Sequence, residues 1–297
     1  MSGQKRILII GHGEMGQAMG QLLARHAPSV WERHPKGGRA VPDLGLAAAN
    51  AEVILFCVPA AAHAELAGYI APRLAASTCC VSIAKGLDDQ GRCAWRIFHD
   101  VLSGKGHYAI LYGPMISEEI RAGKLAFADV ADSSAADFKM LCDVFAGSAL
   151  KLQESTDPLG LSWCAILKNI YAIAFGIADA LTLGDNLRGH LAVAALEEIA
   201  AISVHLGGRI ETAYRRAGLG DLVTTATSAG SHHHALGGFL VRGELDRVRG
   251  EGVHSLDVIQ QRRLWDGGRY PLFDMLSDIV RQPHTTRQRF ESYLAQL

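Results

Sequence analysis

Short apolar runs recur along the first half of the chain and alternate with longer stretches in which apolar residues return every three or four positions. Such short runs are typical of strands buried on both faces, and the longer pattern is typical of helices that pack on one side. We expect strands at residues 6–10, 29–32, 52–58, 78–84 and 107–112, with weaker candidates at 125–131 and 149–153. Helices are expected from the end of the first strand to about residue 25 and at 60–74, 92–102 and 135–145. This alternation predicts βαβ units in a doubly wound parallel sheet.

The pattern changes near Asp157-Pro158, and no strand-like run longer than a few residues follows it. Apolar positions beyond this point keep the helical period. Helices are expected at residues 159–183, 191–206, 255–265 and 272–280. We therefore predict an α/β domain at residues 1–156 and an all-α domain at residues 157–297.

Composition narrows the class of partner. The 297 residues suit two domains, and 49% of them are hydrophobic, which is enough for buried cores. The 29 Lys and Arg residues balance 30 Asp and Glu residues, so no overall field favours nucleic acid or an anionic membrane. The apolar runs Ile7–Ile10 and Ile170–Ala178 are too short for a signal peptide and a bilayer span, respectively. The six cysteines are scattered and form no C-x-x-C pair, so we expect a cytoplasmic protein. Because the charge favours neither nucleic acid nor a membrane, we expect its partners to be small molecules.

A glycine-rich segment, Gly11-His12-Gly13-Glu14-Met15-Gly16, follows the first expected strand and opens a helix. This is the context in which G-x-G-x-x-G binds a dinucleotide. The first glycine permits the tight turn, the second lets the backbone approach a pyrophosphate, and the third lets helix and strand pack closely. The pyrophosphate would be held by the N–H groups of the helix N-terminus. The alternative is a tight turn without a ligand.

Two charged residues after the second expected strand bear on the choice between NAD and NADP. Glu32 lies 21 residues after Gly11, where a carboxylate binds the adenosine ribose hydroxyls and repels a 2′-phosphate. Arg33 follows it and would instead attract that phosphate. Because Glu32 is at the strand end, we expect NAD(P) with a preference for NAD. The alternative is a solvated surface pair.

Lys168 and Asn169 precede an otherwise apolar helical run. Desolvation lowers the pKa of a lysine in such a helix and suits it to exchange a proton near neutral pH. The alternative is a lysine at a helix edge whose ammonium group reaches solvent. Asp221 lies in a glycine-rich turn, Gly218-Leu-Gly-Asp, before a predicted helix, and taken alone it resembles an N-cap.

Several motifs in order resemble the NAD(P)-dependent glycerol-3-phosphate dehydrogenase family along nearly the full chain. They are the Gly11–Gly16 loop, Val58-Pro59, Lys85-Gly86-Leu87, Gly113-Pro114 with Glu119 and Gly123, Leu167-Lys168-Asn169, Gly184-Asp-Asn186-x-Arg188, Gly218-Leu-Gly-Asp221-Leu-Val-Thr, Ser228-x-x-Ser231 and Glu251-Gly252. The resemblance implies a Rossmann-type nucleotide-binding domain followed by a helical domain. It also implies reduction of dihydroxyacetone phosphate to glycerol 3-phosphate, with a lysine as acid/base.

The resemblance assigns expected roles residue by residue. Lys168 would be the catalytic acid/base, with Asn169 and Asp221 beside it. Residues expected at the substrate are Lys85, Gly113, Ser231, His232 and His233. Residues expected at the cofactor, besides the Gly11–Gly16 loop and Glu32-Arg33, are Pro59, Lys85, Ser117, His232 and Glu251.

The chain departs from the family where the substrate phosphate is bound. The family has Ser-Arg-Asn where this chain has Ser231-His232-His233, and Met115 replaces the serine of its G-P-S-F-A segment. Met15 also replaces the tryptophan of the glycine loop. Three adjacent histidines without a carboxylate or cysteine at ligand spacing predict no metal site. A solvated loop is one interpretation of His232 to His234, and an imidazolium in place of the arginine is another.

Two alternatives to the glycerol-3-phosphate activity follow from these departures. A reductase of the same fold could act on a small keto or hydroxy compound without a phosphate, as ketopantoate reductases do. A dinucleotide-binding protein without turnover is the second. The sequence also allows a homodimer.

Overall fold

A computed structural model describes residues 3–35, 41, 43–228 and 231–297 of the chain. In this part of the chain, seven strands form one sheet in the order β2-β1-β3-β4-β5-β6-β7. The strands are β1 (Ile7–Ile10), β2 (Ser29–Trp31), β3 (Val53–Phe56), β4 (Cys79–Ser82), β5 (His107–Tyr112), β6 (Ala126–Asp132) and β7 (Leu150–Glu154). Every residue of β1, β3 and β4 is buried, which explains why these strands are apolar throughout rather than alternating.

The sheet is parallel except at one pair. β1 pairs in parallel with both β2 and β3, and β3, β4 and β5 continue the parallel order. β6 runs antiparallel to β5, with Ala109 opposite Asp132, and β7 is parallel to β6. The expectation of a doubly wound parallel sheet is confirmed except at β6, because apolar runs identify strands but not their direction. The α/β fold class, with a helical region after it, is confirmed.

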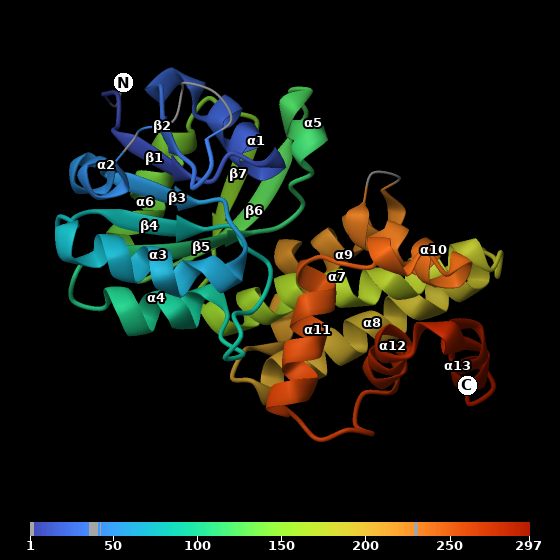
Figure 1. Cartoon of the computed structure of the whole chain (residues 1–297). Helices are drawn as coiled ribbons and strands as arrows, with labels where there is room; N and C mark the ends of the chain where they lie inside the picture. The colour runs from blue at the N-terminus through green and yellow to red at the C-terminus, as the bar shows by residue number, and fades with distance from the viewer. Residues whose placement is uncertain (1–2, 36–40, 42, 229–230) are drawn as a thin grey trace. The chain divides into compact units, whose positions relative to one another are not determined.

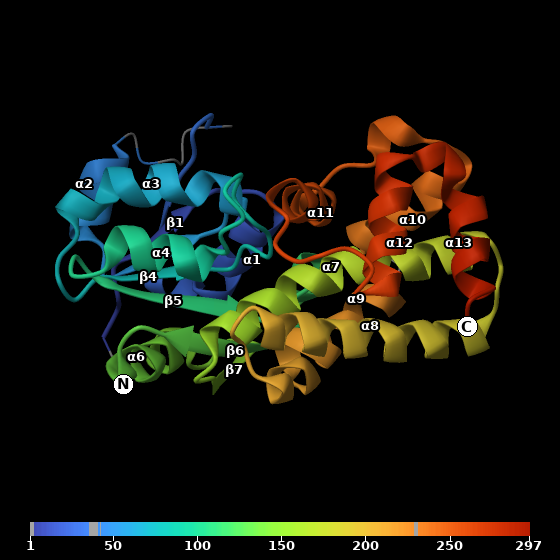
Figure 2. The same cartoon turned by 90° about the horizontal axis from the view of Figure 1, so that it is seen from below.

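Helices cover both faces of the sheet (Figure 2). On one face, α1 (Glu14–Leu22) and α6 (Ala135–Phe145) contribute Met19, Leu22, Leu141 and Phe145 to the core. On the other face, α2 (Leu44–Asn50), α3 (His63–Ile70) and α4 (Ala94–Leu102) contribute Leu44, Leu66, Ile70, Phe98 and Leu102. Alternate residues of β1 point to opposite faces, so Ile7 and Ile9 join the first core and Leu8 and Ile10 the second.

Helices make up the rest of the chain (Figure 1). They are α7 (Pro158–Ala180), α8 (Asp185–His205), α9 (Asp221–Thr227), α10 (His232–Arg242), α11 (Glu251–Arg262), α12 (Pro271–Arg281) and α13 (Thr286–Leu294). α7 and α10 cross at two glycines, because a Cβ atom at Gly176 would collide with the carbonyl of His234 and one at Gly237 with the carbonyl of Ile173. This close approach fixes where α10 begins along α7.

α7 is the central helix of this region. Its residues from Gly160 to Ala178 are all buried. With 23 residues and a mean hydropathy of 1.5, α7 is long and apolar enough to cross a membrane, contrary to the length argument from Ile170–Ala178. The apolar window is wholly buried inside the protein, which is typical of a core helix.

Contacts between Cα atoms divide the chain into two compact units. The first comprises residues 1–85 and 92–158, and the second comprises residues 86–91 and 159–297. The segment from Gly86 to Gly91 thus belongs with the helices, although it follows β4 in the sequence. The predicted domain limits at residues 156 and 157 stay a prediction.

Several short helices have no counterpart among the expected elements. They are α2, α5 (Ser117–Arg121), α10 and α13, whereas α9 is the helix expected after the Gly218-Leu-Gly-Asp turn. Single-turn 3-10 segments lie at Ala24–His26, Ala60–Ala62, Ala71–Arg73, Ile210–Tyr214, Leu245–Arg247 and Pro283–Thr285, with a π-helical turn at Arg216–Gly220. α10 corrects the interpretation of His232 to His234 as a loop, since the three histidines form its first turn.

Candidate active site

The glycine-rich segment lies at the carboxyl end of β1, where the strand order changes direction between β2 and β3. Gly11 has a φ of 95°, and a Cβ atom there would lie 2.6 Å from Val58 Cγ1. A Cβ atom at Gly16 would collide with the Gly11 carbonyl, whereas one at Gly13 would meet no described atom within 4 Å. Gly11 therefore permits the turn, Gly16 permits the close helix–strand contact, and Gly13 leaves space for a ligand to approach the backbone, as the motif requires.

α1 begins immediately after Gly13, so the N–H groups of its first turn lie at the open side of the loop. These N–H groups and the helix dipole fit the pyrophosphate of a dinucleotide. His12 is half-buried in the loop, Met15 packs partly against the core, and Glu14 is exposed. The carboxylate of Glu14 is thus the one acidic group within the loop itself.

Glu32 and Arg33 follow β2 and differ in their surroundings. Glu32 is half-buried at the strand end, and Arg33 is exposed. The Arg33 guanidinium donates to Glu65 Oε1 of α3 at 2.7 Å. A cavity of about 450 Å³ adjoins the ion pair of Arg33 and Glu65. It is lined by Trp31, Arg33, Asp43, Leu44, Glu65, Leu66 and Tyr69. Its aromatic and aliphatic walls are suitable for an adenine ring.

The structure brings together two residues that the resemblance places at the substrate. Lys85 Nζ donates to the Gly113 carbonyl at 2.9 Å. Gly113 has a φ of 158°, and a Cβ atom there would collide with the backbone of Phe127 on β6. Ser117 is buried at the start of α5 and donates through Oγ to Glu118 at 3.0 Å, while Pro59 is exposed after β3.

Lys168 lies near the middle of α7, and its side chain is only 7% exposed. Its Nζ atom is 3.1 Å from Asp221 Oδ1 and donates to Thr225 Oγ1 at 2.7 Å. The interpretation of Lys168 as a lysine that reaches solvent is therefore wrong. Asp221 is not the N-cap of α9, which is Gly220; it is a buried first-turn residue whose carboxylate pairs with the lysine. Sequence reasoning did not single out Thr225, although it follows Asp221 by one helical turn.

Lys168 is also the only lysine between residues 159 and 297. A buried ammonium is stable only when a carboxylate and hydrogen-bond acceptors compensate its desolvation. Asp221 and Thr225 provide that compensation. The arrangement holds a charged proton donor in a largely water-excluded place.

Asn169 and His233 approach each other at Gly252 of α11. A Cβ atom at Gly252 would lie 2.9 Å from His233 Cδ2 and 3.1 Å from the Asn169 carbonyl oxygen. The neighbouring Glu251 packs over Gly86, where a Cβ atom would lie 2.9 Å from Glu251 Oε1. Three of the predicted residues, Asn169, His233 and Glu251, thus come together although they are far apart in the sequence.

The other residues of the histidine segment have distinct partners. Ser231 is the N-cap of α10, and its Oγ accepts from the His234 N–H at 3.3 Å. His232 is exposed and donates through Nε2 to the Arg249 carbonyl at 2.7 Å. A neutral imidazole that donates through Nε2 has no proton on Nδ1, so it can bind an anion there only when protonated.

His234, which the sequence analysis did not select, joins a charged cluster. His234 Nε2 lies 2.7 Å from Asp179 Oδ2, and Arg188 Nη1 donates to both oxygens of Asp179 at 3.1 and 3.2 Å. The cluster ties the start of α10 to the end of α7 and to α8. Arg188 belongs to the Gly184–Arg188 motif of the resemblance, and this motif was the sequence signal that could have pointed to the cluster.

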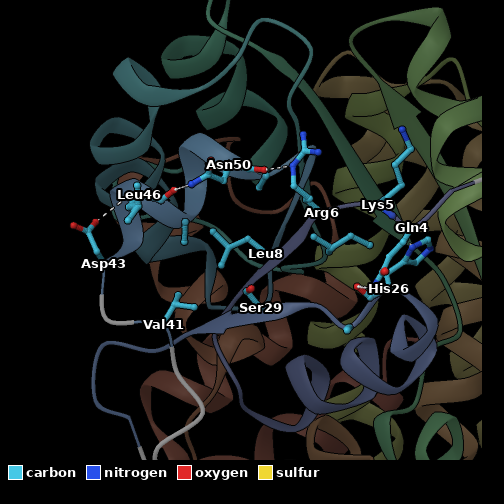
Figure 3. A pocket seen from close by; sticks show the side chains of 14 residues that line it. Gln4, Lys5, Arg6, Leu8, His26, Ser29, Val41, Asp43, Leu46 and Asn50 are labelled. Carbon is cyan, nitrogen blue, oxygen red and sulfur yellow. Dashed lines mark hydrogen bonds between the residues drawn. The ribbon is translucent and has the colours of Figure 1, made fainter.

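A further cavity lies away from these residues (Figure 3). It has a volume of about 550 Å³, and Lys5, Arg6, His26, Ser29 and Asn50 are among its lining residues. These residues lie at the amino ends of β1 and β2, opposite the glycine loop. Since dinucleotides bind at the carboxyl ends of parallel strands, this cavity is not a candidate for the cofactor.

Among the described residues, no group of three or more His, Cys, Asp or Glu side chains is arranged to hold a metal ion. The expectation that no metal is used stays a prediction.

The doubly wound sheet and its glycine loop define the class of nicotinamide-dinucleotide-binding oxidoreductases. Residues 33–137 match the N-terminal part, and residues 157–291 the C-terminal part, of NAD-dependent glycerol-3-phosphate dehydrogenase. A glycerol-3-phosphate dehydrogenase [NAD(P)+] of Agrobacterium fabrum is 33% identical over 268 residues, which are 81% of this chain and 81% of that protein. One from Synechococcus elongatus is 31% identical and covers 94% of this chain and 92% of its own length.

Solved structures agree with this relation. The glycerol-3-phosphate dehydrogenase of Coxiella burnetii superposes with a TM-score of 0.87 at 26% identity, over 98% of this chain and 99% of that one. The chain belongs to the NAD-dependent glycerol-3-phosphate dehydrogenase family, which confirms the resemblance of its motifs. A ketopantoate reductase of Ralstonia eutropha has a TM-score of 0.58 at 19% identity, and this likeness concerns the fold alone.

Proposed function

We propose that this protein interconverts dihydroxyacetone phosphate and glycerol 3-phosphate with NAD(P) as the hydride carrier. The observation that carries the proposal is the buried group of Lys168, Asp221 and Thr225 in a chain of this family. A carbonyl group becomes a hydroxyl group in this reduction, so the enzyme must supply one proton to oxygen. Lys168 is a charged donor in a suitable environment for that task.

The cofactor, when bound, supplies or accepts the hydride. The chain's own part is to hold it, and Gly11, Gly13 and Gly16 fit its pyrophosphate. Glu32 is suited to the ribose hydroxyls. The ion pair between Arg33 and Glu65 engages the arginine that would otherwise attract a 2′-phosphate, which supports a preference for NAD.

In our proposal, Lys168 gives its proton to the substrate oxygen during reduction and takes it back during oxidation. Asp221 keeps the ammonium charged and, with Thr225, fixes its direction. Lys85 and Gly113, which are joined by a hydrogen bond, are proposed to orient the substrate. Further substrate contacts are proposed for Asn169, Ser231, His232 and His233.

We also propose a cytoplasmic location, small-molecule partners only and a homodimer. The six free cysteines support the first, and the balanced charge of 29 basic and 30 acidic residues supports the second. Exposed apolar side chains at Val193, Val204, Ile210 and Tyr214 support a second copy that covers them. Light scattering would give twice the chain mass of 31.8 kDa for a dimer, and a value near 31.8 kDa would exclude one.

A panel of carbonyl substrates tests the activity. Oxidation of NADH or NADPH is followed with dihydroxyacetone phosphate, with unphosphorylated dihydroxyacetone and with ketopantoate. Turnover of dihydroxyacetone phosphate is expected. Turnover of ketopantoate alone would support the alternative reductase, and tight cofactor binding without any turnover would support a non-catalytic protein.

A further inference from the structure

The glycine loop carries a negative charge beside the expected diphosphate site. Glu14 is the first residue of α1 and directly follows Gly13, on whose open side the pyrophosphate is expected. A carboxylate at a helix N-terminus stabilises the helix by interacting with its dipole. The same carboxylate repels a second anion that binds to that N-terminus.

One cation of the same compact unit compensates this carboxylate. Arg121, the last residue of α5, donates through Nη2 to Glu14 Oε2. Its Nη1 atom donates to Gln17 Oε1 at 3.4 Å, and its backbone carbonyl accepts from Gln21 Nε2 at 3.1 Å. Glu14, Gln17 and Gln21 form one stripe along α1, so the arginine is held at both its head group and its backbone.

We propose that Arg121 is a positioning residue that determines cofactor affinity. It neutralises and holds aside the Glu14 carboxylate, so that the N–H groups of α1 can bind the diphosphate. This inference rests on the proposed function, because it needs a dinucleotide at the loop. Glu14 is 63% and Arg121 32% exposed at the side chain, so the effect is moderate rather than absolute.

The test measures dissociation constants for NADH and NADPH by nicotinamide fluorescence, without turnover. Four proteins are compared: the natural chain, Arg121→Gln, Glu14→Gln and the double variant. We expect Arg121→Gln to raise both dissociation constants by about three- to tenfold, the scale of one unscreened charge near a diphosphate. Glu14→Gln should leave the constants unchanged or lower them. The double variant should bind within about twofold of the natural chain, since neither charge remains.

Two further readouts separate electrostatics from structure. The weakening in Arg121→Gln should shrink as salt is raised from about 0.05 to about 0.5 M, because salt screens the Glu14 carboxylate. Lys124→Gln is the matched control, since it removes another exposed ion pair nearby, Lys124 with Glu119 at 2.9 Å. This control should bind both nucleotides like the natural chain.

Each contrary result has a distinct meaning. Unchanged affinity in Arg121→Gln, or a double variant as weak as Arg121→Gln, would overturn the inference and leave Arg121 a structural contact between α5 and α1. Weaker binding in Glu14→Gln would overturn it as well. Failure of the natural chain to bind either nucleotide would overturn the proposed function and this inference together.

Discussion

Lys168 concentrates the proposed chemistry in one side chain. Its ammonium is paired with Asp221 at 3.1 Å and hydrogen-bonded to Thr225 at 2.7 Å, and it lies on a helix whose residues from Gly160 to Ala178 are all buried. A buried charge at this position lowers stability unless it is paired, and its partners are themselves buried. Lys168, Asp221 and Thr225 are therefore better treated as one interacting group than as three independent side chains.

Replacing Lys168 by Ala should lower kcat by about 10² to 10⁴, the usual contribution of a general acid. Lys168→Arg should be similarly impaired, because arginine keeps the charge but does not release its proton. Either change disturbs the buried Asp221 carboxylate, which pairs with Lys168. Lys168→Ala is therefore also combined with Asp221→Asn, which removes the negative charge so that the protein still folds. Stopped-flow rates and NADH titrations provide the check. A kcat near that of the natural chain would remove Lys168 from the mechanism.

Glu32 should set the cofactor preference. We expect NADH to bind more tightly than NADPH, and Glu32→Ala to narrow or reverse the difference. Glu65→Gln should improve NADPH binding by up to about fivefold, because it releases Arg33 from a surface ion pair of 2.7 Å. Tighter binding of NADPH to the natural chain would refute the role of Glu32 and make Arg33 the main determinant.

His232 should be a weak partner for the substrate phosphate. Its Nε2 atom already donates to the Arg249 carbonyl, so a neutral ring has no second hydrogen to offer an anion. An arginine at this position would carry a permanent charge and several N–H donors. The KM for dihydroxyacetone phosphate should therefore be higher in the natural chain than in a variant with that arginine.

The double variant His232→Arg with His233→Asn checks this prediction in steady-state kinetics. It should lower KM by up to about tenfold, through a permanent charge and charge-assisted hydrogen bonds. No gain in the double variant would show that these histidines do not bind phosphate. The natural substrate would then be one without a phosphate.

At the scale of elements, a single carboxylate connects three helices. Glu198 of α8 accepts from the Leu272 and Phe273 N–H groups at the start of α12, at 2.7 and 2.9 Å. It also accepts from the Tyr171 hydroxyl of α7 at 2.7 Å. Burial raises the pKa of Glu198, and its three hydrogen bonds only partly oppose that effect. The ionisation of Glu198 therefore makes the free energy of unfolding of the protein depend on pH.

The sign of that dependence follows from the raised pKa. The unfolded group ionises around its ordinary value of 4.5, whereas the folded group holds its proton to higher pH. Its contribution to the free energy of unfolding is thus complete below pH 4.5 and is lost as the pH rises through the folded pKa. Relative to Glu198→Gln, the natural chain should lose stability over this range in urea titrations. Glu197→Gln, which changes an exposed neighbour, should show no such difference from the natural chain. The account would be contradicted if the free energies of unfolding of the natural chain and of Glu198→Gln changed in parallel with pH.

The apolar pattern predicted the strands and the long helices well and several short helices poorly. Val53–Phe56 could be recognised because burial on both faces leaves a continuous apolar run, and Ala135–Phe145 because one buried stripe leaves a helical period. α5 could not, since Ser117–Arg121 buries only Ser117 and Ile120 and carries mostly charged residues. The antiparallel direction of β6 was also beyond the pattern, because it depends on how the chain returns after β5 rather than on which residues are apolar.

At the scale of the whole molecule, the candidate site was predicted as a set of residues but not as a set of contacts. The glycine loop has a local geometry, so its context in the sequence was sufficient. The pairing of Lys168 with Asp221 spans 53 residues, so the apolar pattern could not predict it; the resemblance placed the two residues together, and the packing of α9 on α7 shows the contact. Thr225, His234 and Arg121 were missed for the same reason: each matters through a partner distant in the sequence.

The rate of NADH oxidation with dihydroxyacetone phosphate, measured on the purified natural chain, tests the central claim most directly. The account predicts saturable turnover, a kcat/KM within the usual enzymatic range of about 10⁴ to 10⁸ M⁻¹ s⁻¹, and a much smaller value for dihydroxyacetone. The reverse reaction with glycerol 3-phosphate and NAD should proceed as well. Tight NADH binding with no oxidation above background, or equal rates with and without the phosphate group, would contradict it.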